Sequence, residues 1–403
     1  MRVVGMMSGT SVDGVDVAVV DVDAVDGGER LVLRRVAEAT VPFDPALRQR
    51  VLDVLPGSTA AHRPDVGELC RLDADLGRAL AAAARQAVTE LADGAADLLV
   101  SHGQSVHHEV VDGRVLATLQ LGQPAEIAEA TGLPVVSDLR TRDVAAGGQG
   151  APLVSLLDQL VLADTTAPVA ALNLGGIANL TVVAPDRPTV AFDAGPANAL
   201  LDAAVRTATD GREHHDPGGR RTAVGRVDEA LLAVLLDDPF LAAPAPKSTG
   251  KERYHAGYLD RALAAAPVDR LEDRLATLAE AVAVAVADHA ARHAVRRVVG
   301  SGGGVHNAGL VAALRRRLAA MGATWDTSDT LGLPVDGKEA IAFALLGWLS
   351  WHGLPGTVAS CTGAAGPRVL GSLTPGADPL RLPASPAAAP RSATVLGPVA
   401  SPK

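Results

Sequence analysis

Two carboxylates stand at positions in this 403-residue chain where a side chain could do acid–base chemistry. Asp193 ends the apolar, strand-like run 189–192, and Glu339 opens the helical pattern 339–351. A carboxylate at the carboxyl end of a strand faces the crevice in which open α/β sheets bind ligands. From there it could take a proton from a water molecule, so Asp193 is the better candidate for a general base.

Each carboxylate also has a structural interpretation that the sequence leaves open. A glycine-proline pair after Asp193 leads into a helical pattern from Ala199, so Asp193 would serve equally well as a cap of that helix. The spacing from Asp336 to Glu339 is that of a capping box, in which the Glu339 carboxylate would accept from the backbone N–H of Asp336.

A glycine-rich turn near the N-terminus could bind an anion. Strand-like runs at 3–6 and 15–21 flank the segment 7–16, in which Asp13-Gly14 is a β-hairpin signal. The small residues 8–11 leave backbone N–H groups and hydroxyls uncovered, which is what a phosphate requires of a loop. An ordinary hairpin with a polar tip explains this segment equally well.

A second turn repeats this design. The apolar runs 169–174 and 180–183 enclose Gly175-Gly176, and adjacent glycines would otherwise weaken a strand pattern. The two hairpins begin roughly 170 residues apart, about the size of one domain. Two similar halves, each with a phosphate-sized turn, predict a nucleotide held in a cleft between two lobes.

A third glycine-rich segment follows the strand-like run 297–299. The segment Gly300-Ser301-Gly302-Gly303-Gly304 is followed by Val305, at the position where a dinucleotide-binding fingerprint has its third glycine. The segment therefore does not match that fingerprint. Gly250-Lys251 is followed by Glu252, so a P-loop is excluded. Paired glycine hairpins with a separate glycine loop fit an α/β, two-lobed actin-like (ribonuclease H-like) sugar kinase fold, in which the late loop faces adenosine.

The chain resembles the anhydro-N-acetylmuramic acid kinase family, and the matching motifs occur in the expected order from Met1 to about Leu373. They lie at residues 7–16, 101–106, 143–153, 173–179, 192–198, 247–252, 302–304 and 339–344. The resemblance implies a kinase that uses ATP and water to open 1,6-anhydro-N-acetylmuramic acid and to phosphorylate its O6. The products would be N-acetylmuramic acid 6-phosphate and ADP, in peptidoglycan recycling.

The resemblance also implies roles for individual residues. Asp193 would be the catalytic base, and Glu339 would position the water or the substrate. The residues that would bind ATP are Gly9, Thr10, Ser11, Val12, Asp13, Gly14, Val15, Asp16, Gly175, Gly176, Gly302, Gly303 and Gly304. Mg²⁺ would accompany the nucleotide, held through water by Asp13, because Mg²⁺ at a triphosphate is usually carried by one or two carboxylates. Alternatively, Asp13 would only build the turn with Gly14.

The sugar site implied by the resemblance follows two strand-like runs, at 98–100 and 134–136. Its candidate residues are His102, Gln104, Asp138 and Arg140. The Arg140 guanidinium would suit the lactyl carboxylate of the sugar, or would form a structural ion pair with Asp138 or Asp143. His102 could equally be a satisfied structural histidine.

Two adjacent histidines depart from the family pattern. His107 and His108 stand where relatives usually carry arginine, so a positive charge is lost at neutral pH. This difference leaves a kinase of another anhydro sugar as an alternative. A catalytically silent actin-like ATP-binding protein is a second alternative, against which Asp193 and Glu339 argue.

Composition and patterning limit the partners. The net charge of −10 argues against a nucleic-acid surface. Charged residues interrupt the apolar stretch 271–294, which predicts an amphipathic helix rather than a membrane span. No secretory pattern opens the sequence, so we expect a cytoplasmic enzyme. The family resemblance suggests a homodimer.

The expected organisation has two lobes and a tail. The first lobe would comprise residues 1–133 and 355–373, and the second would comprise residues 134–354. From residue 374 to residue 403 the chain is rich in proline, alanine and serine, and we expect this tail to be disordered.

Overall fold

The computed structural model describes residues 1–9, 12–55, 58, 64–111, 114–245, 247–250 and 253–398, and the chain divides into two compact units. Unit 1 comprises Met1–Ala163, Leu331–Leu333 and Gly337–Lys403, and unit 2 comprises Asp164–Thr330 and Pro334–Asp336. This division differs from the predicted one, because residues 134–163 and 337–354 belong to unit 1.

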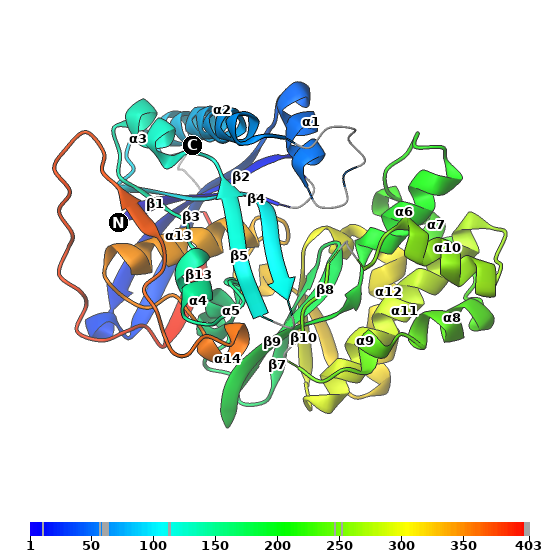
Figure 1. Ribbon diagram of the computed structural model, residues 1–403. Helices are drawn as coiled ribbons and strands as arrows, with labels where there is room; N and C mark the ends of the chain where they lie inside the picture. Colours follow the sequence, from blue (N-terminus) through cyan, green and yellow to red (C-terminus); the bar gives the residue numbers. More distant parts are fainter. Residues whose placement is uncertain are drawn as a thin grey trace, which may run out of the picture. The chain divides into compact units, whose positions relative to one another are not determined.

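Unit 1 is built on a mixed β-sheet with helices on both faces (Figure 1). Its strands are β1 (Arg2–Ser8), β2 (Gly14–Val25), β3 (Arg30–Pro42), β4 (Leu98–Val111), β5 (Arg114–Leu121), β6 (Val135–Ser137), β12 (Ser372–Thr374) and β13 (Ser392–Leu396). Its helices are α1 (Pro45–Val54), α2 (Val66–Gln86), α3 (Pro124–Thr131), α4 (Thr141–Ala145), α5 (Ser155–Val161), α13 (Lys338–Trp351) and α14 (Ala359–Thr362).

The sheet of unit 1 explains where the unit ends. Strands β1, β2 and β3 form an antiparallel meander, and β4 and then β6 add in parallel on the other side of β1. Helix α13 packs on β1 at Gly5, where a Cβ atom would lie 2.2 Å from the Ala340 carbonyl oxygen. Because β6 extends this sheet and α13 covers it, both belong to unit 1 and not to the second half of the chain.

Unit 2 carries its own five-stranded sheet. The strands are β7 (Val169–Leu174), β8 (Ile177–Ala184), β9 (Arg187–Pro196), β10 (Arg297–Ser301) and β11 (Thr324–Thr327). The helices are α6 (Asn198–Ala208), α7 (Arg220–Val224), α8 (Glu229–Leu236), α9 (Pro239–Ala242), α10 (Ala256–Ala265), α11 (Leu271–Arg292) and α12 (Ala308–Ala320), with 3₁₀ turns η3 (Pro217–Gly219) and η4 (Gly303–His306). Figure 1 shows α11 and α12 beside this sheet, with α10 farther out.

The two sheets share one topology. In unit 2, β7, β8 and β9 form an antiparallel meander, and β10 and then β11 add in parallel beside β7. This is the same strand order and direction as β1, β2, β3, β4 and β6 of unit 1. The repeat of an antiparallel meander extended by two parallel strands confirms the ribonuclease H-like fold in each half.

The predicted tail is ordered through residue 398, contrary to the expectation. Strand β13 pairs in parallel with β3, and β12 pairs antiparallel with β6. Ala393 and Val395 alternate with exposed residues and are buried, as expected of an edge strand with one buried face. Composition alone did not reveal this short alternation, and residues 399–403 lie outside the described part.

Helix α11 corresponds to the predicted amphipathic stretch 271–294. Buried residues run along most of its length, while Glu272, Asp273 and Arg292 mark its two ends. Over the residues that the structure describes, no helix combines the length and the apolar character needed to cross a membrane.

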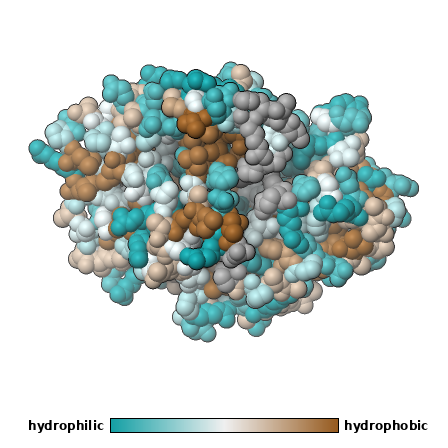
Figure 2. Space-filling model, viewed as in Figure 1, coloured by the Kyte–Doolittle hydropathy of each residue, from teal (hydrophilic) through white to brown (hydrophobic). Residues whose placement is uncertain are grey.

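A β-hairpin with exposed apolar side chains projects from unit 1. Figure 2 shows apolar groups near the centre of this face of the molecule. The exposed apolar residues of β4 and β5 are Val110, Val111, Leu116 and Leu119. His107 and His108 lie on the same exposed part of β4. The two residues that depart from the family pattern are therefore solvent-facing.

Candidate functional site

The candidate residues of unit 2 share one edge of its sheet. Strands β7 and β10 are parallel, so their ends at Leu174 and Ser301 lie at the same edge. The antiparallel meander brings the end of β9 to that edge as well. The sheet thus gathers the Gly175-Gly176 turn, Asp193 and the Gly302 loop, as the strand-end argument predicts.

Asp193 lies beside a β-bulge near the end of β9. Asn179 pairs with Asp193 and Ala178 pairs with Gly195, which leaves Ala194 as an extra residue. Bulges re-aim side chains next to functional sites. Helix α6 begins after the N-cap Ala197, which makes no side-chain cap. The interpretation of Asp193 as the cap of this helix is therefore not supported.

A distant segment holds Asp193 in place. The backbone N–H of Asp193 donates to the Lys247 carbonyl over 3.0 Å. The backbone N–H of Thr249 donates to Asp193 Oδ2 over 2.8 Å. Residues 247–252 match a family motif, but no signal in the sequence links them to Asp193. Lys251 and Glu252 lie outside the described residues.

The Gly175-Gly176 turn is fastened to the start of α6. The Gly175 carbonyl accepts from Asn198 N, and the Gly176 carbonyl accepts from Ala197 N and Ala199 N. A Cβ atom on Gly175 would find its nearest neighbour 3.8 Å away, at Ile177 O. The turn is therefore fixed on one side and has space on the other, as a phosphate-binding turn requires.

The three glycines of the late loop differ in their surroundings. Gly302 has φ +83°, and a Cβ atom there would lie 2.4 Å from Asn173 Oδ1. On Gly304 a Cβ atom would lie 2.7 Å from Leu174 Cβ, whereas on Gly303 it would meet nothing within 4 Å. The first and third glycines allow the loop to pack on the end of β7, and the second faces open space.

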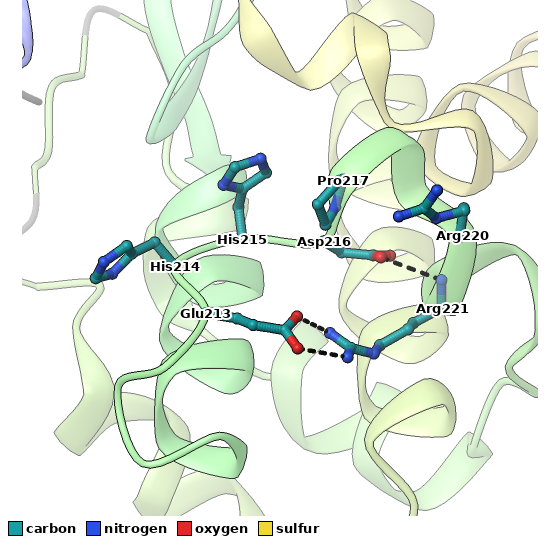
Figure 3. Close-up of a pocket in the computed structure, with 7 residues that line it drawn as sticks. All are labelled: Glu213, His214, His215, Asp216, Pro217, Arg220 and Arg221. Atoms are coloured by element: carbon teal, nitrogen blue, oxygen red, sulfur yellow. Dashed lines mark hydrogen bonds and ion pairs between the residues drawn. The ribbon is translucent and has the colours of Figure 1, made fainter.

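A pocket of about 490 Å³ lies beside this loop in unit 2 (Figure 3). Its lining residues are Glu213, His214, His215, Asp216, Pro217, Arg220 and Arg221. It adjoins the turn η4 because Gly219, at the end of η3, packs so closely on Asn307 that a Cβ atom would lie 2.1 Å from Asn307 Oδ1.

Both acidic residues of this pocket already have partners. Glu213 Oε1 and Oε2 accept from Arg221 at 2.9 and 2.5 Å, as Figure 3 shows. Asp216 is buried and accepts from the backbone N–H groups of Arg221 and Thr222. This leaves Arg220 and two exposed imidazoles, His214 and His215, facing solvent. No sequence pattern predicts this pocket, because only the fold brings Gly219 of η3 against Asn307 after η4.

The corresponding edge of unit 1 carries the N-terminal turn. Met7 pairs with Asp16, which confirms the predicted hairpin. Val12 has φ +56° and its N–H donates to the Gly9 carbonyl over 3.2 Å. A β-branched residue in this conformation is strained, and such strain gathers at functional sites. Thr10 and Ser11, both predicted to bind ATP, lie outside the described residues.

Three further residues of this turn serve its geometry. A Cβ atom on Gly14 would lie 2.4 Å from the Val41 carbonyl oxygen, so β2 and β3 approach closely there. Val15 is buried, and Asp16 Oδ1 accepts from the Thr40 hydroxyl over 2.6 Å.

Asp13 has a structural partner. Its Oδ1 accepts from Arg48 Nη2 over 3.1 Å, and Arg48 Nε donates to the Val12 carbonyl. These contacts tie the turn to α1, and the Asp13 side chain remains 69% exposed. Within the described part of the chain, no group of three or more His, Cys, Asp or Glu residues could hold a metal ion. A nucleotide-bound Mg²⁺ needs only one or two protein carboxylates, so Asp13 still fits that role.

Two of the predicted sugar-site residues touch one another. Arg140 Nε donates to His102 Nε2 over 2.8 Å, and Arg140 Nη1 donates to the Gly150 carbonyl over 2.7 Å. His102 Nδ1 lies 3.0 Å from the Gly103 carbonyl, so Nδ1 carries the proton and Nε2 accepts. Burial, reinforced by the Arg140 charge, lowers the pKa of His102 to about 3. His102 is thus a neutral acceptor that orients Arg140.

Two acidic residues near Arg140 are bonded elsewhere. Asp143 is fully buried and accepts from Gly150 N and from the Thr362 hydroxyl. Asp138 accepts from the Thr141 hydroxyl over 2.5 Å, with φ +52°. Among the described residues neither aspartate forms an ion pair with Arg140, so the predicted structural pair is absent there.

Gln104 connects this region to the N-terminal turn. The Ser8 hydroxyl donates to Gln104 Oε1 over 2.6 Å, and Gln104 Nε2 donates to the Ser105 carbonyl over 3.1 Å. Both side chains are buried. Gln104 is therefore a positioning residue for the end of β1.

Glu339 lies in the first turn of α13 and does not cap it. The helix begins at Lys338 after the N-cap Gly337, with no side-chain cap, so the predicted capping box is absent. Burial raises the pKa of Glu339, opposed by the charges of Arg140 and Lys338 and reinforced by Asp16. Lys338 Nζ forms a buried ion pair with Asp158 over 2.5 Å. In the described part of the chain the Glu339 carboxyl has no hydrogen-bond partner, so it is available to a ligand.

Comparisons with known proteins agree along nearly the whole chain. A family model described as "Anhydro-N-acetylmuramic acid kinase" matches residues 1–376. A Streptomyces coelicolor protein named anhydro-N-acetylmuramic acid kinase is 55% identical over 98% of this chain and 100% of its own length. Relatives of the same name from Rhodococcus erythropolis and Pseudomonas paraeruginosa are 48% and 40% identical, and each alignment covers 93% of this chain and 94% and 99% of the relative. This chain belongs to the anhydro-N-acetylmuramic acid kinase family.

Proposed function

We propose that this protein is an ATP-dependent kinase that opens 1,6-anhydro-N-acetylmuramic acid with water and phosphorylates the released O6. The products are N-acetylmuramic acid 6-phosphate and ADP, in the recycling of peptidoglycan. The full-length similarity to relatives of this name supports the reaction. The placement of Asp193, at a bulged strand end beside the Gly175-Gly176 turn, is the observation that carries the mechanism.

Asp193 acts as the general base in this mechanism. Its carboxylate takes a proton from water, the water oxygen bonds to the anomeric carbon, and the bond from that carbon to O6 breaks. The freed O6 attacks the γ-phosphorus, and the bond from that phosphorus to the β,γ-bridging oxygen breaks. The backbone N–H of Thr249 donates to Asp193 Oδ2 and fixes the direction of the carboxylate that is proposed to face water.

Glu339 and Arg140 are proposed to bind the sugar and the water. Glu339 has a partly buried carboxyl without a hydrogen-bond partner among the described residues, which suits an acceptor for a hydroxyl or water. Arg140 uses Nε and Nη1 within the protein, and its Nη2 remains to meet the lactyl carboxylate of the sugar. Gln104 and Asp138 shape this region through their hydrogen bonds with Ser8 and Thr141.

The nucleotide is proposed to lie along the glycine turns. Residues 9–16 and Gly175-Gly176 hold the phosphates, and the Gly302 loop faces adenosine. Mg²⁺ bound with ATP would neutralise charge on the β- and γ-phosphates. Asp13 is the carboxylate of the N-terminal turn that would hold it, in competition with Arg48.

The pocket between Glu213 and Arg221 is proposed to take the adenosine end of ATP. It adjoins the η4 turn of the Gly302 loop through Gly219 and Asn307. Its flat imidazoles and Arg220 offer faces on which a base can stack. The His215→Ala substitution should raise the KM for ATP and leave the KM for the sugar unchanged.

Three further assignments are proposals that rest on the family. The enzyme acts in the cytoplasm. It forms a homodimer, which sedimentation would test. The sugar is the anhydromuramic acid rather than another anhydro sugar, as in the name of the relatives.

The reaction is tested by the position of oxygen from water in the product. ATP and 1,6-anhydro-N-acetylmuramic acid are incubated with the protein in ¹⁸O-water, beside levoglucosan and N-acetylmuramic acid. Label at the anomeric hydroxyl together with a 6-phosphate is the expected result. Phosphorylation of a different sugar would show that the proposed substrate is wrong. The absence of product from all three sugars would favour the silent ATP-binding alternative.

A further inference from the structure

Lys247 has an unusual environment for a lysine close to the proposed base. Its ammonium donates to the carbonyls of Phe240 and Leu241 over 2.6 and 3.2 Å, and it lies 3.1 Å from His289 Nε2. The same nitrogen lies 4.4 Å from the centroid of the Phe240 ring. Three N–H groups therefore meet three neutral acceptors.

The backbone of Lys247 belongs to the segment that is hydrogen-bonded to Asp193. The Lys247 carbonyl accepts from Asp193 N, and Thr249, two residues on, donates to Asp193 Oδ2. The side chain ties this same segment to α9 through Phe240 and Leu241, and to α11 through His289. We propose that Lys247 is a positioning residue, whose ammonium holds the segment 247–249 so that the Thr249 N–H stays on the Asp193 carboxylate. This inference rests on the proposed role of Asp193.

The ammonium form is the one that fits this environment. A neutral amine has two N–H groups and a lone pair, so one of the three acceptors would lose its donor and face the lone pair. His289 is held neutral, because burial and the Lys247 charge lower its pKa to about 4, and in the tautomer with an unprotonated Nε2 it accepts from the ammonium.

The pKa of Lys247 nevertheless lies close to neutral pH. Burial, with the charge of Arg292, lowers the pKa of Lys247 to about 8. The charges of Asp193 and Asp238 act in the opposite direction. Among the described residues, the titratable and charged groups around Lys247 are Asp193 on β9, Asp238 before α9, Arg253 near the Phe240 ring, and His289 and Arg292 on α11.

The arrangement predicts a loss of turnover above about pH 8 that is not a loss of folding. Because burial lowers the pKa of Lys247 in the folded state, the folded protein releases this proton at a lower pH than the unfolded chain does. The contribution of Lys247 to the free energy of unfolding therefore grows as pH rises from the folded pKa towards the unfolded one. Its contributions to activity and to stability thus change in opposite directions over this range.

The test is the pH profile of kcat and KM for wild type, Lys247→Met, Lys247→Arg and Arg292→Gln. Lys247→Met should lower kcat by about 10²-fold, the cost of a misplaced catalytic group, with an unchanged KM for ATP. Lys247→Arg keeps the charge, so it should recover part of kcat and lose the alkaline decline. Arg292→Gln removes a neighbouring positive charge, so it should keep the neutral-pH kcat and move the decline to higher pH.

Each outcome separates this inference from the proposed function. Wild-type turnover of the anhydro sugar establishes the function first, and its absence would overturn the function itself. Once that turnover is measured, two results would overturn the role of Lys247. One is a wild-type kcat in Lys247→Met, and the other is an alkaline decline of kcat that Arg292→Gln does not move. Melting temperatures of all variants at pH 7 and pH 9 identify a variant that loses activity only because it unfolds. If Lys247→Met is such a variant, the pH profile of Arg292→Gln decides whether Lys247 has the proposed role.

Discussion

Arg140 donates from Nε to Nε2 of His102 over 2.8 Å, and the His102 ring is buried against Phe343 with centroids 4.5 Å apart. The histidine thereby fixes one edge of the guanidinium, and the Gly150 carbonyl accepts from Nη1 over 2.7 Å. His102 is therefore a buried acceptor that orients Arg140, the arginine proposed to bind the sugar.

Replacing His102 by Phe should weaken sugar binding. The ring keeps its place beside Phe343, but Arg140 Nε loses its acceptor, which costs about 1–3 kcal/mol for a buried donor. We expect the KM for the sugar to rise about tenfold or more, with the KM for ATP unchanged. His108→Phe, at an exposed position, is the control, and an equal effect of both substitutions would refute the contact's role.

Asp193→Asn should abolish ring opening while keeping nucleotide binding. An amide cannot accept the proton from water, so turnover should fall by about 10²- to 10⁴-fold. Single-turnover assays and ATP titration by calorimetry measure the two effects separately. Asp288→Asn on the exposed face of α11 is the matched control, and wild-type turnover in Asp193→Asn would remove Asp193 from the mechanism.

Glu339→Gln should lower kcat and raise the free energy of unfolding. Burial raises the pKa of Glu339, so the folded state binds its proton more tightly, and the free energy of unfolding falls as pH rises through that range. At pH 7 the glutamine removes this cost and should raise Tm, by about 2–4 °C for each kcal/mol recovered, while kcat drops. Glu129→Gln, an exposed change on α3, should do neither, and a lower Tm in Glu339→Gln would contradict the assignment.

Two glycines of the late loop should respond differently to alanine. Gly302→Ala forces a Cβ atom to 2.4 Å from Asn173 Oδ1 at φ +83°, so Tm should fall. Gly303→Ala places its methyl group in open space, so Tm should stay, whereas the KM for ATP should rise if the nucleotide uses that space. Thermal melting and ATP kinetics of the two variants test this. An unchanged KM for ATP in Gly303→Ala would show that adenosine does not bind beside Gly303.

Deletion of residues 390–403 should destabilise unit 1. The deletion removes β13 with the buried side chains of Ala393 and Val395, worth about 2 kcal/mol of apolar burial. A Tm lower by about 5 °C is expected, compared with a control that lacks only residues 399–403. Identical melting of both truncated chains would show that β13 adds nothing.

The sequence by itself determined the local features of this protein. The glycine pair at 175–176, the Asp13-Gly14 hairpin and the strand-end position of Asp193 follow from alternation and turn chemistry over a few residues. Such patterns act within one element, so they fix the strands and the sheet edge on which the candidate residues lie. Together with the family resemblance they predicted the ribonuclease H-like fold that both sheets display.

Only the tertiary structure decided which distant residues meet. Thr249 reaches Asp193 across 56 positions, and Arg140 reaches His102 across 38. The capping spacing of Glu339 was not used, because α13 begins after Gly337 and packs on β1. Contacts of this kind depend on the path of the whole chain, and local propensity cannot encode them because it does not specify which elements become neighbours.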